Sequence, residues 1–364
     1  MPLEQAGAIL TIDLGALRRN FRLLAARLHG QAACAAVVKA DGYGLGADRV
    51  AQALRDEGCE TFFVAHVCEA TALRKALGAA PSLFVLNGLP PGAEGAAAAA
   101  GLVPVCNSLE QLDAWRAEAG RRGASLPVAV QVDSGMTRLG MSPGEVERLA
   151  AEPERLAGLD LRLVMSHLAC ADEPAHPANE SQLRAFAALR RKLPPAPASL
   201  ANSSGIFLGE RFYFDLARPG AALYGVNPRP GEPNPMEAVI ELSARVIQTR
   251  EVAAGTGIGY GHTLLAAAPL RTATISIGYA DGWPRRAAAA AYLGDVKLPF
   301  AGRVSMDSII LDVSALDRGR LRPGDLVELI GPHQGVDDVA ALSGTIGYEI
   351  LTGLGRRFHC RYVD

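Results

Sequence analysis

Cationic and hydrogen-bonding side chains follow several apolar runs of this sequence. Lys39 follows AAVV, Arg138 lies in VDSGMTR, His167 ends LRLVMSH, and Arg218 follows FYFDLA. Each has an ordinary explanation when taken alone: a solvated lysine or arginine, or a hydrogen-bonded core histidine. Because all of them come where a predicted strand ends, we interpret them together as one functional site.

A phosphate-binding segment is also predicted after the last of these runs. RPGAALYG places Gly220 in a turn that leads into a helix start, where free backbone amides can bind an anion. ANSS adds Asn202 and Ser203 at the end of the preceding run. A lysine beside a phosphate site indicates pyridoxal phosphate, bound to Lys39 through a Schiff base. Burial beside other cations would favour the neutral amine that this bond requires.

Eight short apolar runs must position these side chains. Helical patterns separate the runs, and SLEQ and SPGE predict helix N-caps at Ser108 and Ser142. Parallel strands need such crossovers, so we predict an α/β fold with a (β/α)8 TIM barrel over residues 8–232, a doubly wound open sheet being the alternative. The runs are AACAAVV, TFFVA, SLFVL, LVPV, VAVQV, LRLVMSH, ASLAN and FYFDLA.

A second, β-rich domain is predicted over residues 233–364. The Pro- and Gly-rich segment RPGEPNP separates it from the barrel, and beyond that segment apolar residues alternate with polar ones, as in VIELSARVIQT. The early run ILTID at 9–13 would be a ninth strand for the barrel, so it is a candidate to pair with the second domain.

Composition and charge favour a small-molecule partner. The 364 residues carry 36 Lys and Arg against 38 Asp and Glu, a net charge of −2, which gives no field for binding nucleic acid or anionic lipid. The six cysteines lie far apart, so neither disulfides nor a metal site is predicted. The first residues lack the basic segment of a signal peptide, and no run is long enough to span a membrane. We therefore expect a cytoplasmic protein.

Several motifs together resemble one enzyme family. VVKADGYGLGA is similar to the cofactor motif of alanine racemases, and VDSGMTRLG, MSHLA, ANSSG, ARPGAALYG, GIGYGHT, IGYADGW, AGRVSMD and GYEIL resemble further blocks of that family in the same order. The resemblance implies two domains, pyridoxal phosphate and a homodimer with shared active sites. It also implies interconversion of L-alanine and D-alanine, for cell-wall peptidoglycan or for alanine catabolism.

The resemblance implies a role for individual residues of this sequence. Lys39 would hold the cofactor and act as one base, and Tyr260 would act as the base on the opposite face. His167 would couple Tyr260 to Arg218, which would face the pyridine nitrogen. The remaining implied contacts are to the cofactor, chiefly its phosphate, from Tyr43, Asn202, Ser203, Gly220, Ala221 and Tyr348, and to the substrate from Arg138, the Met306 backbone and Tyr279.

Racemisation explains why two bases and an arginine are needed. A proton leaves one face of Cα and returns to the other, which a single base cannot easily do in both directions. Tyrosine ordinarily has a pKa near 10, so a neighbouring imidazole and arginine would have to favour its anion. Arginine is effectively always protonated and cannot take a proton from the pyridine nitrogen, so the ring stays neutral and transamination is suppressed.

One position departs from the family pattern. Many members carry a lysine, often carbamylated, where this sequence has Gln131, seven residues before Arg138. A neutral amide cannot replace the charge of a carbamate. Asp133 or a bound anion such as chloride is the candidate to orient Arg138 instead.

Other functions fit parts of the pattern. Gly42, Gly44 and Ala47 satisfy G-x-G-x-x-A, with Glu60 near the spacing of a ribose-binding acid, as in dinucleotide-binding enzymes. A non-catalytic cofactor-binding protein on a similar barrel would lack the second domain and Tyr260. A serine or broad-specificity racemase is the nearest alternative within the family, and related amino-acid decarboxylases share the same domain plan.

Overall fold

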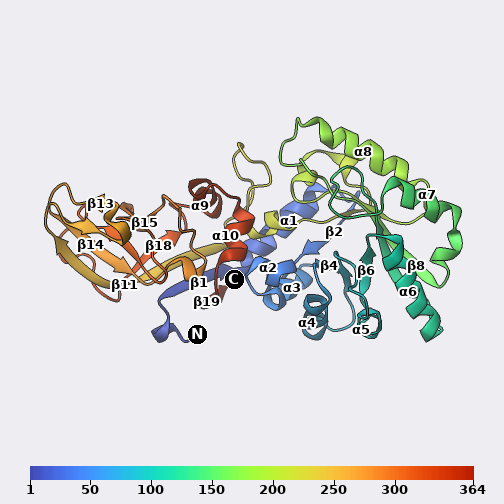
Figure 1. Cartoon of the computed structure of the whole chain (residues 1–364), viewed down its shortest axis with the longest axis horizontal. Coiled ribbons are helices and arrows are strands. Elements are labelled where there is room, and N and C mark those ends of the chain that lie inside the picture. The colour runs from blue at the N-terminus through green and yellow to red at the C-terminus, as the bar shows by residue number, and fades with distance from the viewer. The chain divides into compact units, whose positions relative to one another are not determined.

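The computed structural model describes residues 1–364, which divide into two compact units (Figure 1). The first, here called the β unit, comprises Met1–Ala16, Tyr224–Val226 and Glu237–Asp364. The second, called the barrel unit, comprises Leu17–Leu223 and Asn227–Met236. The division predicted between residues 232 and 233 falls within the last segment of the barrel unit.

The barrel unit is a closed parallel barrel. Strands β3 to β9 pair in chain order, and β10 pairs in parallel with β2. The remaining gap closes because Asp215 N donates to Ala198 O at 3.0 Å and Arg218 N donates to Ala201 O at 2.9 Å. The strands are β2 Ala33–Cys34, β3 Ala36–Val37, β4 Thr61–Val64, β5 Ser82–Val85, β6 Val103–Cys106, β7 Leu126–Gln131, β8 Leu159–Met165, β9 Ala198–Ser199 and β10 Leu216–Ala217.

The predicted barrel is therefore confirmed, with β2 and β3 forming one interrupted strand. The run FYFDLA is shorter as a strand than predicted, because only Leu216 and Ala217 pair. Phe214 has φ +51°, in the left-handed region that strands exclude, and Glu210–Phe212 forms a 3₁₀ turn. Asp215 instead uses its carboxylate to accept a hydrogen bond from Ala198 N at 2.7 Å.

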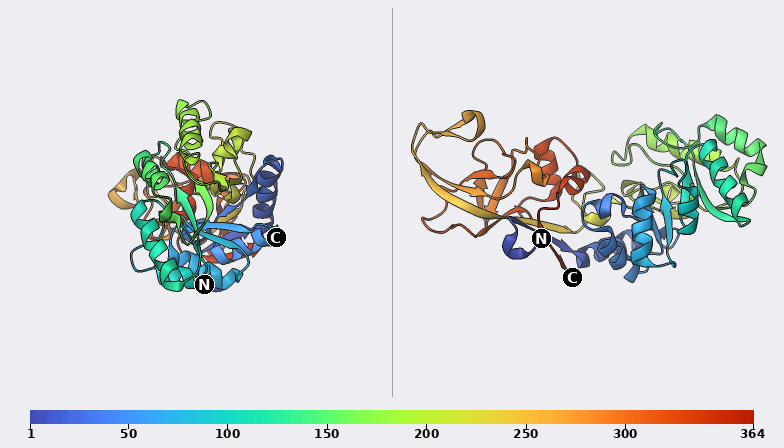
Figure 2. Two further views of the ribbon diagram at one scale, coloured as in Figure 1. Left: turned by 90° about the vertical axis from the view of Figure 1, so that its right-hand side faces the viewer. Right: turned by 60° about the horizontal axis from the view of Figure 1, so that its bottom comes forward.

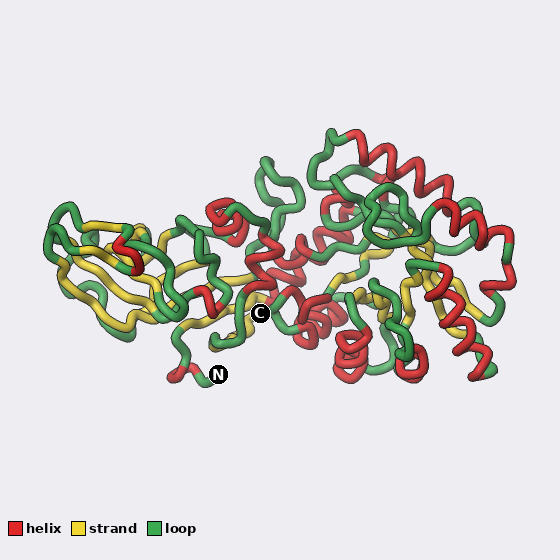
Figure 3. Tube along the Cα trace, viewed as in Figure 1, coloured by secondary structure: helices red, strands yellow, loops and turns green.

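Helices lie around the strands of the barrel, as Figure 2 (left) and Figure 3 show. Both predicted N-caps are present: Ser108 Oγ accepts from Gln111 N, and Ser142 and Glu145 form a reciprocal capping box. Such caps contribute about 1 kcal/mol each and fix where a helix begins after its strand. The helices are α1 Leu14–Arg27, α2 Lys39–Tyr43, α3 Ala47–Asp56, α4 Val67–Leu77, α5 Glu94–Ala99, α6 Leu109–Arg122, α7 Pro143–Ala151 and α8 Pro177–Arg190. None of the helices has the length and apolar character that crossing a bilayer requires.

The β unit is built around one long antiparallel strand. β11, Ile240–Val252, pairs with β1, β14 and β18, and shifts register twice, which bends it enough to serve two parts of the sheet. β1, Ala8–Asp13, lies between β11 and the last strand, β19, His359–Val363. The other elements are β12 Gly257–Ile258, β13 Leu264–Leu265, β14 Leu270–Ile275, β15 Ala290–Leu293, β16 Val296–Pro299, β17 Ile309–Asp312, β18 Leu326–Ile330, α9 Val336–Ser343 and α10 Gly347–Gly353.

Candidate active site

Lys39 begins an unusual turn at the carboxyl end of the first barrel strand. The turn Lys39–Tyr43 contains three non-glycine residues with left-handed φ angles: Ala40 at 52°, Asp41 at 55° and Tyr43 at 56°. Such a conformation costs roughly 1–2 kcal/mol per residue, so the surrounding contacts must hold it. Glu69 does so in part, because its Oε1 accepts a hydrogen bond from Ala40 N at 2.6 Å.

The Lys39 amine has no hydrogen-bond or ion-pair partner within the chain. Its side chain is partly buried, and burial together with the nearby Arg138 charge lowers the pKa of the amine, against the opposing effect of Glu69. A lysine ordinarily stays protonated far above neutral pH. The surroundings at this strand end therefore shift the lysine towards its neutral, nucleophilic form, which is the direction that the sequence predicted.

Arg218 is a buried arginine that has no carboxylate partner. Only 3% of the residue is exposed, and its guanidinium donates to Ser199 Oγ and, at 2.7 Å, to Ser166 O. The guanidinium carbon also lies 5.9 Å from the centre of the Phe63 ring. Burial lowers the pKa of Arg218 to about 9, which still leaves it protonated at neutral pH. The cation is therefore held in a fixed position by neutral groups alone.

His167 lies beside this arginine and is held neutral. Its Nδ1 is 3.5 Å from Arg218 Nη2. Since the guanidinium can only donate, Nδ1 acts as the acceptor and the ring proton belongs on Nε2. Burial is the largest cause that lowers the pKa of His167, and together with the charges of Arg218, Arg138 and Lys39 it brings this pKa to about 3.

The predicted phosphate site is a cluster of hydroxyl and amide groups. Ser203 Oγ accepts from Gly220 N at 3.0 Å and from Ala222 N at 3.2 Å. Ala221 is buried, and its N–H makes no hydrogen bond within the chain. A Cβ at Gly220 would lie 2.4 Å from Tyr43 Oη, so only glycine lets the tyrosine reach this cluster. One free amide, that of Ala221, together with a hydroxyl and a close backbone approach, gives this cluster the features of an anion cradle.

Two predicted residues accept hydrogen bonds from nearby backbone amides. Asn202 caps the following 3₁₀ turn, Ser204–Phe207, since its Oδ1 accepts from Gly205 N at 2.9 Å. Asp133 does not orient Arg138: its Oδ1 accepts three backbone hydrogen bonds, from Gly135, Met136 and Thr137, at 2.9 to 3.1 Å. Arg138 is exposed and pairs with no carboxylate. The hypothesis that Asp133 orients Arg138, in place of the carbamylated lysine that other members carry at position 131, is therefore wrong.

Four predicted residues belong to the β unit. Tyr260 lies in the 3₁₀ turn Tyr260–His262 between β12 and β13 and is 68% exposed. Tyr279 and Met306 lie on adjacent loops, because Tyr279 N donates to Ser305 O at 3.1 Å and Ala280 N to Met306 O at 3.0 Å. Tyr348 lies in α10. The structure thus brings Lys39, Arg138, His167 and Arg218 together within the barrel unit, and Tyr279 and Met306 together within the β unit.

Sequence reasoning missed the groups that hold these residues. Ser199 and Phe63 contact Arg218, and Glu69 holds the turn after Lys39, yet none of them stands in a motif. Ser199 and Phe63 lie inside apolar strand runs and Glu69 inside a helix, where their types are unremarkable. Only the folded structure shows which site residues these three side chains contact.

The dinucleotide alternative does not fit the turn around Gly42. The start of α3 at Ala47, where a pyrophosphate would bind, is already occupied by a carboxylate, because Asp41 Oδ1 accepts from Ala47 N at 3.0 Å. The left-handed residues before it also differ from the tight glycine turn of such sites. We therefore discard this interpretation.

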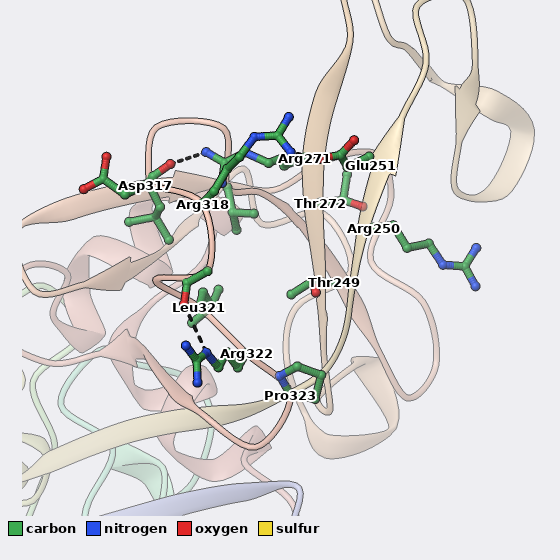
Figure 4. A pocket seen from close by; sticks show the side chains of 13 residues that line it. Thr249, Arg250, Glu251, Arg271, Thr272, Asp317, Arg318, Leu321, Arg322 and Pro323 are labelled. Atoms are coloured by element: carbon green, nitrogen blue, oxygen red, sulfur yellow. Dashed lines mark hydrogen bonds and ion pairs between the residues drawn. The ribbon is translucent and has the colours of Figure 1, made fainter.

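A separate cavity of about 330 Å³ lies in the β unit, lined by parts of β11 and β14 and by residues 313–323 (Figure 4). It contains none of the predicted site residues. Its arginines are mostly occupied: Arg318 pairs with Glu251 at 2.6 Å, Arg322 donates to Gly319 O, and Arg250 points away from the cavity in Figure 4. The cavity therefore offers no comparable cluster of catalytic groups.

Two family models together match almost the whole chain. The alanine racemase N-terminal domain matches residues 12–228, and the alanine racemase C-terminal domain matches residues 239–362. The chain belongs to the alanine racemase family. The resemblance seen in the sequence motifs is confirmed, and both matches cover the segments that carry the candidate site residues.

Individual alanine racemases resemble this chain over nearly its full length. A catabolic alanine racemase of Mesorhizobium japonicum is 65% identical over 98% of this chain and 94% of its own, and a catabolic alanine racemase of Agrobacterium fabrum is 53% identical over 99% and 93%. The crystal structure of alanine racemase from Bartonella henselae, with covalently bound pyridoxal phosphate, is 43% identical, with a TM-score of 0.94 over 98% of this chain and 100% of that one.

We expect His167 to make the protein less stable as the pH falls. Its pKa is about 3 in the folded chain and ordinarily 6.5, so between these values the unfolded chain binds a proton that the folded chain does not. The free energy of unfolding should therefore fall with pH in that window, by up to about 1.4 kcal/mol per pH unit. His167→Asn removes this titration and should flatten the slope.

Urea unfolding at about pH 7.5, 6 and 5 measures the slope directly. His29→Asn is the matched control, since His29 is exposed and its left-handed φ of 51° suits asparagine. The control should keep the wild-type slope. An unchanged slope in His167→Asn would show that His167 is not held neutral.

Proposed function

We propose that this chain interconverts L-alanine and D-alanine with pyridoxal phosphate, using Lys39 and Tyr260 as bases on opposite faces of the substrate. The observation that carries the proposal is the unpartnered Lys39 amine, with its lowered pKa, at the same end of the barrel as the amide and hydroxyl cradle. Family membership supports the reaction, and the Bartonella henselae relative supports the cofactor.

The residues of the barrel unit fit this cofactor. Lys39 would bind it covalently, while Ser203, Gly220 and Ala221 would receive its phosphate with their hydroxyl and amide groups, beside Tyr43. Tyr348 of the β unit is assigned to the same phosphate from the family pattern alone. Bound pyridoxal phosphate would supply the electron sink that makes the Cα hydrogen of an amino acid acidic.

Lys39 and Tyr260 would move the proton. A neutral lysine amine can take a proton from Cα, and burial with a cationic neighbour lowers the pKa of the Lys39 amine towards that form. Tyr260 offers a phenol that is 68% exposed in this chain and is free to meet a substrate. One of the two groups would take a proton from Cα while the other, carrying a proton of its own, would give it to the opposite face, which inverts the carbon.

Arg218 and His167 would set the proton content of the site. A guanidinium with a pKa of about 9 holds its proton at neutral pH, so an acceptor that faces it receives a hydrogen bond and stays unprotonated. His167 accepts from Arg218 at Nδ1, which leaves its Nε2–H to donate to the Tyr260 phenolate. This chain of donors would favour the tyrosine anion.

A second copy of the chain is the proposed source of Tyr260. The β unit exposes Tyr260, Leu265 and Met306 by 68%, 62% and 52%, an apolar set that a monomer would leave in water. In a two-fold homodimer each site would combine one copy's barrel residues with the other copy's β-unit residues. Arg138 and the Met306 backbone would then bind the substrate carboxylate, with Tyr279 and Tyr348 narrowing the pocket.

Catabolic use of alanine is the role that the relatives favour. The alanine racemases of Mesorhizobium japonicum and Agrobacterium fabrum, at 65% and 53% identity, are both named catabolic. The biosynthetic enzyme of Pseudomonas aeruginosa is 38% identical. We therefore place this chain with the catabolic members, and supply of D-alanine for peptidoglycan is the second role.

A panel of L-amino acids tests the proposed reaction. The purified holoenzyme should convert L-alanine and D-alanine to an equal mixture, because enantiomers have the same free energy, as chiral chromatography would show. Serine should react with a kcat/KM lower by about tenfold to a hundredfold, since a pocket narrowed by tyrosines rejects an added hydroxyl only moderately. Equal or faster turnover of serine would favour the broad-specificity alternative.

Borohydride reduction tests the role of Lys39. Reduction of the holoenzyme should fix a pyridoxyl group on Lys39, identified by mass spectrometry of its proteolytic peptide, because only this lysine has a lowered pKa beside the cradle. The other lysines, Lys75, Lys192 and Lys297, serve as internal controls. A label on any of them in place of Lys39 would refute the assignment.

Mixed dimers test the shared site. Lys39→Ala and Tyr260→Phe homodimers should be nearly inactive, but in a mixed dimer both lesions fall on one site and leave the other intact. Random exchange makes about half of the dimers mixed, so roughly a quarter of all sites should work. If both residues served one site within one chain, proven mixed dimers would recover no activity.

A further inference from the structure

We infer that Arg357 is a positioning residue for the substrate carboxylate: it bridges Asp281 and Asp307, fixing the turn that presents the Met306 amide and neutralising the carboxylate next to it. The inference rests on the proposed function, in which the Met306 backbone binds the substrate. Nothing in the sequence motifs indicated Arg357, which lies between α10 and β19.

Arg357 joins two loops of the β unit. Its Nε lies 2.7 Å from Asp281 Oδ1, and its Nη2 lies 2.8 Å from Asp307 Oδ1. Asp281 ends the 3₁₀ turn that carries Tyr279, and Asp307 directly follows Met306. The two carboxylates raise the pKa of Arg357, so the bridge is charged at any working pH.

The loops that it joins are already in close backbone contact. A Cβ at Gly278 would lie 2.3 Å from Met306 O, so only glycine permits this approach. Asp281 is fixed from two further sides: its Oδ2 accepts from Gly278 N at 2.9 Å, and its carbonyl accepts from Gly355 N at 2.8 Å. Arg357 therefore holds Asp307 against a rigid support.

The Met306 turn presents a free amide. Ser305 N donates to Ser308 O at 3.0 Å, closing the turn, and Met306 O accepts from Ala280 N. The Met306 N–H makes no hydrogen bond within the chain, and the residue is 52% exposed. An unpartnered N–H on a braced turn is a suitable donor for a carboxylate.

Charge gives Arg357 a second task. Asp307 is 60% exposed and carries its negative charge beside the amide that would receive an anionic substrate. Unpaired, that charge would repel the substrate carboxylate, whereas the Arg357 guanidinium cancels it. Removing Arg357 should therefore weaken substrate binding more than removing Asp307, and removing both should restore part of the loss.

Steady-state kinetics of the holoenzyme separate positioning from a structural role. Arg357→Gln should raise KM for both alanine enantiomers about fivefold with kcat within about twofold, the pattern of lost uniform binding. Arg357→Lys keeps the charge but only one of the two contacts, so it should raise KM less than Arg357→Gln does. Asp307→Asn should change KM by about twofold or less. The double variant, Arg357→Gln with Asp307→Asn, should have a lower KM than Arg357→Gln alone.

Inhibition by propionate, alanine without its amino group, reports carboxylate binding independently of catalysis, and its inhibition constant should rise in parallel with KM. Arg318→Gln is the matched control, since it breaks another arginine pair of the same unit, with Glu251 at 2.6 Å, and should change neither constant. A shift in Arg318→Gln as large as that in Arg357→Gln would mark a general loss of order and overturn the inference.

Unchanged KM and propionate inhibition in Arg357→Gln, or a fall in kcat alone, would also overturn it. The Arg357–Asp307 pair is exposed, and such pairs contribute about 0–1 kcal/mol to stability. Asp281 is buried but keeps its hydrogen bond from Gly278 N, so these variants should fold. If the Arg357→Gln variant does not fold, the Arg357→Lys and Asp307→Asn variants test the inference in its place. The inference then fails if Arg357→Lys has the same inhibition constant for propionate as the wild-type enzyme. A wild-type enzyme that leaves alanine unchanged would instead refute the proposed function.

Discussion

The candidate site depends on one electrostatic constraint: Lys39, Arg138 and Arg218 gather at the barrel mouth, and none of the three forms an ion pair with a carboxylate. Arg218 is buried with only a hydroxyl, a carbonyl and a ring face around it. Its charge helps to hold His167 neutral, and Arg138 has the same effect on Lys39. Burial is the larger cause of both lowered pKa values, and a carboxylate paired with these cations would oppose it, as Glu69 already does in part at Lys39.

Rigid support makes that constraint tolerable. Burying a cation without a counter-charge, as at Arg218, is unfavourable. The turn after Lys39, with three non-glycine residues in the left-handed region, is strained. Both follow the ends of barrel strands, whose apolar side chains are almost fully buried, as Val38 and Phe63 are. Glu69 and Ser199 then satisfy the polar groups that the strands bring together. The stability of the strands thus offsets the cost of the arrangement that follows them.

The sequence predicted the barrel, and which side chains stand at the ends of its strands, because both depend on local patterns. Apolar runs separated by helix caps define the strands, and Lys39, His167 and Arg218 follow directly where those strands end. The failures have a common physical cause: they concern how a side chain divides its hydrogen bonds. Asp133 could pair with Arg138 or cap its own loop, and three backbone amides outcompete one exposed cation. Phe214 could extend a strand, but its left-handed backbone ends the pairing early.

The two units present different kinds of group. The barrel unit supplies charges whose protonation is fixed by burial, and burial requires a closed core. The β unit supplies an exposed phenol, Tyr260, and an exposed amide, that of Met306, on turns between short strands. Because groups of the second kind are exposed, burial does not hold them in place. Their order has to come from backbone contacts without room for a side chain, as at Gly278, and from ion pairs such as those of Arg357.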